Sequence, residues 1–138
     1  MGHLYLKKLF LKSSLLILLL FYANFSYSLS NQEVRNAIQD WITTQEYPQD
    51  MDEITLMIDT NVTTRGILYS YQLKLNQDDL EDFRQVFQSI KSSALDALCN
   101  NPAMLWYKKN KVEMTYEYYD EDDNIITIFK IHSSLCLN

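Results

Sequence analysis

The sequence predicts an α+β domain in which two helices pack on one face of a four-stranded antiparallel sheet, in the order α-β-β-α-β-β. Two observations predict this class. The spacing of apolar residues changes along the chain between the three- and four-residue steps of a helix and the two-residue step of a strand. Only two prolines and two glycines occur in 138 residues, so regular elements joined by short turns are expected.

The first 28 residues are predicted to be a signal peptide. Three lysines within residues 7–12 precede an apolar run at 15–22, and the small residues Ser26 and Ser28 follow it. Cleavage after Ser28 is expected and leaves residues 29–138 as a single α+β domain. The alternative is an uncleaved anchor, but the apolar run is shorter than the roughly 20 residues that span a bilayer.

Residues 31–45 are predicted to form the first helix, because their apolar residues recur at helical spacing. These residues are Val34, Ala37, Ile38, Trp41 and Ile42. The helix is expected to end ahead of Pro48, since proline disfavours helical geometry in the residue before it. The acidic residues 49–53 then form an exposed loop.

From residue 54 the apolar period changes to two, which predicts a hairpin of two strands. In the first strand, Ile54, Leu56 and Ile58 alternate with more polar neighbours, as in a half-buried strand. A turn over residues 61–66 leads into the second strand. Its alternating residues are Ile67, Tyr69, Tyr71, Leu73 and Leu75.

The second helix is predicted from Asn76, a candidate N-cap, to about Cys99, and the sequence Asn100-Asn101-Pro102 ends it. Its apolar stripe consists of Leu80, Phe83, Phe87, Ile90, Ala94, Ala97 and Leu98. Residues 112–119 and 125–131 alternate again and are joined by residues 120–124. They predict a second hairpin.

Cys99 and Cys136 are expected to form one disulfide, because exported proteins fold in oxidising compartments. The bond would tie the end of the chain to the second helix and stabilise the fold by roughly 4 kcal/mol. The alternative is a redox or nucleophilic thiol. The sequence has no C-x-x-C, and His132 is the only histidine after the signal peptide, so the structural role is favoured.

Removal of the signal peptide leaves nine basic and eighteen acidic residues, a formal net charge of −9. Such an acidic surface repels phosphate backbones and excludes nucleic acid as a partner. It also argues against docking on anionic lipid head groups. Stable membrane insertion is not expected after cleavage.

No enzyme, cofactor or metal site is predicted. The acidic residues 120–124 suggest calcium, but Ile125 and Ile131 stand where an EF-hand loop needs glycine and a bidentate glutamate. A hairpin turn explains this segment better. Glu113 and Glu117 are a conceivable carboxylate pair for glycoside chemistry, yet their alternation with apolar residues indicates the solvated face of a strand.

Tyrosines are concentrated in the predicted strands and supply the candidate partner-binding residues. Tyr118 and Tyr119 are adjacent, so they must face opposite sides of a regular strand. One aromatic row is therefore expected on the face that the helices leave uncovered, where it would form a protein-binding patch. The candidates are Tyr69, Tyr71, Tyr116, Tyr118 and Tyr119.

Residues 76–136 combine a helix ending in Leu98-Cys99-Asn100-Asn101-Pro102, a tyrosine-rich strand over residues 112–120, an acidic turn and a terminal Cys136. This arrangement resembles small exported single-disulfide bacterial proteins of unassigned function. It is more loosely similar to α+β accessory proteins of secretion systems, including one class of pilotins. The resemblance implies an exported α+β domain with one disulfide.

The leading hypothesis is therefore a non-catalytic periplasmic or secreted bacterial protein that binds another envelope or secretion-system protein through an aromatic-rich sheet surface. The alternative is a secreted effector or inhibitor that acts outside the producing cell. A third hypothesis, a small hydrolase, requires a cleft with converging polar groups.

Overall fold

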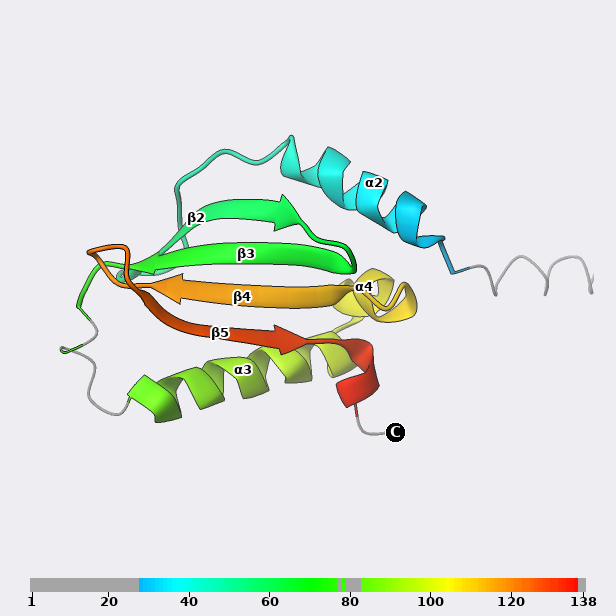
Figure 1. Cartoon of the computed structure of the whole chain (residues 1–138). Helices are drawn as coiled ribbons and strands as arrows, with labels where there is room; N and C mark the ends of the chain where they lie inside the picture. The colour runs from blue at the N-terminus through cyan, green and yellow to red at the C-terminus, as the bar shows by residue number, and fades with distance from the viewer. Residues whose placement is uncertain (1–27, 77, 79–82, 137–138) are drawn as a thin grey trace, which may run out of the picture.

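The computed structural model describes residues 28–76, 78 and 83–136, so nearly all of the predicted signal peptide lies outside the described residues. A single sheet of five strands carries its helices along one face (Figure 1). In chain order the elements are α2 (Asn31–Ile42), β1 (Gln49–Asp50), β2 (Thr55–Val62), β3 (Gly66–Leu73), α3 (Phe83–Asn100), η2 (Pro102–Met104), α4 (Leu105–Lys109), β4 (Glu113–Tyr119), β5 (Ile125–Ile131) and η3 (Ser133–Leu135).

The sheet is mixed, and this corrects the predicted four antiparallel strands. Its strands lie in the order β1-β2-β3-β4-β5, with the short β1 added at one edge. The hairpins β2–β3 and β4–β5 are antiparallel as predicted, but β3 and β4 at the centre are parallel. The reason is that α3 and α4 carry the chain back along the sheet, and a strand entered after such a crossover runs parallel to the strand that precedes the crossover.

Strand β2 buries a different face from the one carrying its most apolar residues. Met57 is 5% exposed, whereas Ile54, just before the strand, is 44% exposed. A register shift between Met57 and Asp59 lets Met57 and Thr60 both lie among buried residues. The alternating pattern therefore predicted the strand but not which side of it is buried.

Helix α2 begins with a capping box, since the Ser30 hydroxyl accepts from the Glu33 N–H at 3.3 Å and the Glu33 carboxylate accepts from the Ser30 N–H at 2.8 Å. Hydrogen bonds from the Ser30 side chain and then its backbone lower the pKa of Glu33. The helix ends at Ile42, earlier than predicted, because the hydroxyls of Thr43 and Thr44 donate to backbone carbonyls of the last turn.

Helix α3 corresponds to the predicted second helix, and its buried residues Phe87 and Leu98 both belong to the predicted stripe. After it, the Asn101 side chain accepts from the Ala103 N–H at 2.9 Å and starts the short η2. The expected first turn of this helix includes residues 77 and 79–82, which lie outside the described residues.

Both predicted helices bury side chains against the same face of the sheet. Val34 and Ile38 of α2 and Leu98 of α3 belong to one core cluster with residues from the strands and their ends. Those sheet residues are Ile67, Val112, Met114 and Ile131, each at most 1% exposed. The helix α4, which the periodicity did not predict, lies at one end of this helical layer (Figure 1).

The predicted disulfide is present. The Cys99 and Cys136 sulfur atoms are 2.04 Å apart, and the two Cα atoms are 5.5 Å apart. The bond joins the last turn of α3 to the end of η3, so the C-terminal tail is fixed to the helical layer. Neither cysteine is free.

The β4–β5 turn is organised by Asp120, which is only 4% exposed. Its carboxylate accepts from the backbone N–H groups of Asn124 at 2.8 Å and Asp122 at 3.0 Å. The Asn124 N–H is the largest of several hydrogen bonds that lower the pKa of this carboxyl. This carboxylate therefore serves the turn, as the preference of aspartate for tight turns suggests.

Candidate functional site

The five tyrosines singled out in the sequence lie on both faces of the sheet. In the parallel register, Tyr69 of β3 stands beside Tyr116 of β4, and Tyr71 stands beside Tyr118. These four side chains lie on the face covered by the helices, where Tyr71 is 9% exposed and Tyr118 is 7% exposed. Tyr119 alone is on the opposite, open face.

The four covered tyrosines form a stacked row with Phe129 of β5. Ring centroids are 5.3 Å apart for Tyr69 and Tyr116, 5.0 Å for Tyr71 and Tyr118, and 5.0 Å for Tyr116 and Phe129. Burial raises the pKa of all four phenols, and that of Tyr118 to about 12, because phenolate loses hydration there. The row is thus an uncharged aromatic layer beneath the helices, and the sequence predicted its residues without assigning each of them to a face.

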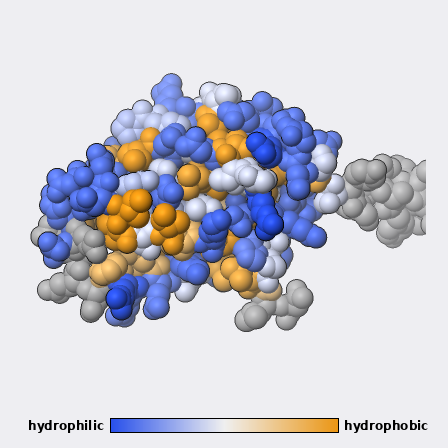
Figure 2. All heavy atoms as spheres, in the orientation of Figure 1, coloured by the Kyte–Doolittle hydropathy of each residue, from blue (hydrophilic) through white to orange (hydrophobic). Residues whose placement is uncertain are grey.

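The open face is largely polar at its centre. The Tyr119 hydroxyl donates to the Glu117 carboxylate at 2.9 Å, and Ser70 contacts the same carboxylate at 3.5 Å. Ile125 and Ile128 on the edge strand β5 are 57% and 49% exposed. Figure 2 shows hydrophobic residues in several patches divided by hydrophilic ones.

An apolar cleft of about 230 Å³ opens between α2 and α4 on the helical side of the molecule. Its lining residues are Ala37, Ile38, Trp41, Ile67, Trp106 and Tyr107. Trp41 and Trp106 stand on the two helices, and each is 37% exposed. Two large aromatic side chains at the rim of one apolar cleft are the most conspicuous binding feature among the described residues.

The cleft exists because the apolar stripe of α2 is wider than the surface that the sheet covers. Val34 and Ile38 point into the core, whereas Ala37 and Trp41 lie at the edge of the stripe. Helix α4 approaches this edge from the crossover and brings Trp106 opposite. The helical spacing predicts Trp41 in the core stripe and does not predict the cleft. The small Ala37, one turn before Trp41, was the available signal of space beside the helix.

Tyr69 connects the cleft to the tyrosine row. Its ring lies edge-on to Trp41 with centroids 6.5 Å apart, and the rings of Trp106 and Tyr107 meet edge-on at 5.2 Å. Of the five predicted partner-binding residues, Tyr69 is therefore the one that the structure brings next to the cleft. Tyr71, Tyr116 and Tyr118 continue the row away from it.

The cleft offers little for acid–base chemistry, since its lining carries only the tyrosine hydroxyl and the two indole N–H groups as side-chain polar groups. Glu113 and Glu117 lie on the open face, where Glu113 pairs with Lys130 at 2.9 Å and Glu117 accepts from Tyr119.

In the part of the chain that the structure describes, no group of three or more histidine, cysteine, aspartate or glutamate side chains could hold a metal ion. Within the same residues, no helix is long and apolar enough to cross a membrane.

Three solved structures share this fold at low sequence identity. A candidate secreted protein from Pseudomonas aeruginosa has a TM-score of 0.63 and 15% identity, with 80% of this chain and 99% of that chain covered. The pilotin EpsS of the Vibrio vulnificus type 2 secretion system has a TM-score of 0.58 and 6% identity, covering 78% of this chain and 92% of that chain. The type II secretion pilotin AspS of Vibrio cholerae has a TM-score of 0.57 and 9% identity, covering 77% and 94%.

These likenesses match the pilotin-like resemblance seen in the sequence and, at such low identity, establish the shared fold alone. None of the curated proteins matches this sequence. A family match does exist and extends over residues 23–128, from the end of the predicted signal peptide into β5. The chain therefore belongs to the family described as domain of unknown function DUF8479.

Proposed function

We propose that this protein is an exported, non-catalytic accessory protein that binds an apolar segment of another envelope or secretion-system protein in the α2–α4 cleft. The observation that carries this proposal is the pair Trp41 and Trp106, each 37% exposed on opposite sides of an apolar cleft. Tryptophan is enriched among the residues that dominate protein–protein binding energy, especially where it borders a pocket.

The fold supports binding rather than chemistry at this position. The two helices and β3 form the walls of the cleft, and the ring of Tyr69 supports Trp41 by an edge-on contact. A preformed apolar cleft of this kind suits one or two large apolar side chains from a partner helix or strand. Tyr69 thereby keeps the partner-binding role proposed for it, as a residue at the inner edge of the cleft.

Export is the second part of the proposal. A disulfide between Cys99 and Cys136 is typical of proteins that fold outside the cytoplasm, and the predicted signal peptide supplies the route. The fold neighbours are pilotins of type II secretion systems and a candidate secreted protein, which supports an accessory role in the envelope.

Site-specific photocrosslinking in the producing cells tests the proposal. A photoreactive residue replacing Trp41 or Trp106 should give a crosslinked band with one envelope protein. The same residue at Ile128 or Val86, which are 49% and 41% exposed away from the cleft, should not. With the purified partner, Trp106→Ala should weaken binding by about tenfold or more, and Ile128→Ala by less than about twofold. Equal crosslinking at all four positions would contradict the cleft as the binding site.

The alternative of a secreted effector or inhibitor is distinguished by its location. The description of the Pseudomonas aeruginosa neighbour as a candidate secreted protein is the observation that favours it. Fractionation of the producing cells should find the protein in the periplasm if it is an envelope accessory protein. Recovery from the culture supernatant, with none in the periplasm, would favour the effector instead.

A further inference from the structure

Charged residues of the described chain are unevenly distributed, with acidic residues in excess at one end of the sheet, where Lys74 pairs with Asp50, and basic residues in excess at the other, where Lys130 pairs with Glu113. The loops at the N-terminal end of β2 and around the β4–β5 turn lie at one end, to the left in Figure 1, together with the loop after β3. They carry Asp50, Asp52, Glu53, Asp78, Asp120, Glu121, Asp122 and Asp123. The opposite end carries Arg65, Lys108, Lys109, Lys111 and Lys130. An acidic protein thus has one basic end.

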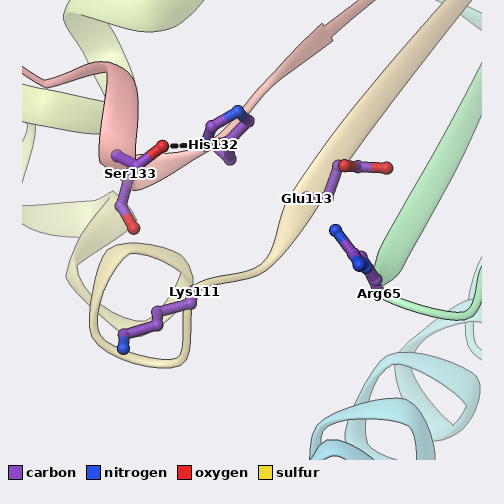
Figure 3. Close-up of a pocket in the computed structure, with 6 residues that line it drawn as sticks. Arg65, Lys111, Glu113, His132 and Ser133 are labelled. Atoms are coloured by element: carbon purple, nitrogen blue, oxygen red, sulfur yellow. Dashed lines mark hydrogen bonds between the residues drawn. The ribbon is translucent and has the colours of Figure 1, made fainter.

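A pocket of about 440 Å³ opens at this basic end. It is lined by Arg65, Lys111, Glu113, His132, Ser133 and Ser134. Figure 3 shows Arg65 and Glu113 extending from neighbouring strands, with His132 at the end of β5 and Lys111 on the turn before β4. Three separate segments of the chain therefore converge on the pocket, and two of them bring a permanent positive charge.

The positive charges outweigh the one carboxylate. Glu113 is neutralised by Lys130, whose ammonium nitrogen lies 2.9 Å from the Glu113 Oε1. Arg65 and Lys111 form no ion pair with any other residue of the described chain. Within a chain of formal net charge −6, two cations beside one pocket that form no ion pair with other described residues locally reverse the sign of the protein's field.

The pocket also has hydrogen-bond donors and a rigid base. The hydroxyl groups of Ser133 and Ser134 line it, and Ser134 is hydrogen-bonded to the His132 ring, as the dashed line in Figure 3 marks. Arg65 is held by the parallel ladder, since its carbonyl accepts from the Glu113 N–H at 3.1 Å. A guanidinium next to hydroxyls is suited to the tetrahedral oxygens of a phosphate group.

We infer that this pocket binds a phosphate group, held by the Arg65 guanidinium, the Lys111 ammonium and the serine hydroxyls. The predicted exclusion of anionic partners rests on net charge and applies to the acidic end and the faces, whereas the basic end attracts anions. The phosphate can belong to a soluble phosphorylated compound or to a phospholipid head group, because both present the same oxygens.

The position of the chain's N-terminal segment bears on the source. The Leu29 N–H donates to the Asn110 side chain at 3.0 Å, so the residues that follow the predicted signal peptide meet the fold immediately beside Lys111. Figure 1 shows the start of α2 at the same end of the molecule as α4 and η3. A chain held at a membrane by its first residues would therefore present this pocket towards the head groups.

An amide NMR titration of the exported protein with inorganic phosphate tests the site, with sodium chloride at matched ionic strength as reference. Phosphate should shift the amides of residues 65–66, 111–113 and 132–134. Arg65→Gln with Lys111→Asn should weaken binding at least about tenfold. Asparagine is chosen because Lys111 has a φ of 53°, which asparagine tolerates. The control is Arg84→Gln with Lys91→Gln, which removes two exposed charges of α3 that do not line the pocket and should leave the affinity unchanged.

A sedimentation assay with phosphatidylglycerol vesicles and phosphatidylcholine vesicles then separates the two sources. Binding to phosphatidylglycerol vesicles that only the Arg65/Lys111 variant loses assigns the site to a lipid head group. Phosphate binding without vesicle binding assigns it to a soluble phosphorylated ligand. The inference is overturned if wild-type protein shows no phosphate-specific shifts around the pocket, or if both double variants weaken phosphate binding equally.

Discussion

Gly66 is the only glycine after the predicted signal peptide, and the backbone of β4 requires it. A Cβ atom at this position would lie 2.0 Å from the Glu113 carbonyl oxygen and 2.8 Å from the Glu113 nitrogen. The contact is with backbone of the neighbouring parallel strand, which cannot move aside as a flexible side chain can. Gly66 therefore sets the start of the β3–β4 pairing and, with it, the position of Arg65.

Gly66→Ala should destabilise the fold by roughly 3 kcal/mol or more, because the new methyl group forces the two central strands apart. Urea unfolding followed by circular dichroism measures this change. Asn61→Ala on the exposed side of β2 is the control and should change the free energy of unfolding by less than about 0.5 kcal/mol. A Gly66→Ala variant as stable as the control would show that β3 and β4 pair differently.

The exposure of Trp41 could not be predicted from the sequence, and for this reason the sequence did not predict the candidate cleft. Trp41 has the spacing of a core residue, and nothing in the periodicity distinguishes it from Ile38, which is 3% exposed. The difference depends on where the sheet ends beneath α2 and on the approach of α4. Both are features of the tertiary structure, which the local spacing of residues does not determine.

At the scale of elements, the local patterns predicted both long helices, both hairpins and the disulfide, because each depends on residues near one another in sequence or on the only possible cysteine pair. The parallel pairing of β3 and β4 was not predicted. The direction of β4 depends on the route of the chain through α3, η2 and α4, which the spacing of apolar residues does not specify. Which tyrosines face the helices also could not be predicted from the sequence, since the helices cover the side on which the two strands align Tyr69 with Tyr116.

The tyrosine row should make stability fall at alkaline pH. Burial, followed by the charges of neighbouring groups, raises the pKa of Tyr118 to about 12 in the folded protein, while an unfolded tyrosine ionises near 10. Between these values the folded state holds more protons than the unfolded state, so the free energy of unfolding decreases as pH rises from about 10 to 12. Urea unfolding at several pH values measures the slope.

Tyr118→Phe provides the test of that assignment, because phenylalanine keeps the stacked ring without an ionisable group. Its loss of stability above pH 10 should be smaller than that of the wild type. Absorbance at 295 nm should also show fewer tyrosines titrating near pH 10 in folded than in unfolded protein. Identical alkaline profiles for wild type and Tyr118→Phe would contradict the assignment.

At the scale of the whole molecule, the disulfide closes the helical layer around the second hairpin. Cys99 and Cys136 lie 37 positions apart in the sequence, and α4, β4 and β5 lie between them. Cross-linking a loop of this length restricts the unfolded chain and should contribute roughly 4 kcal/mol to stability.

Replacing both cysteines with serine should lower the free energy of unfolding by roughly that amount, about 2–5 kcal/mol, without changing the fold. Chemical denaturation measures the difference, and wild-type protein in excess reductant is the matched control and should show a similar loss. Unchanged stability in both samples would mean that the bond does not form in the exported protein.

The parallel pairing of β3 and β4 also affects the order in which the protein folds. Each hairpin unites neighbours across a turn of a few residues, whereas Ser70 and Glu117, partners at the seam, are 47 residues apart. Closing a loop of this length costs more entropy than closing a hairpin, so the β3–β4 pairing is expected to form last. We expect the two halves of the chain to fold locally first. The aromatic row would then be buried from water only in the last step, when the two halves pair.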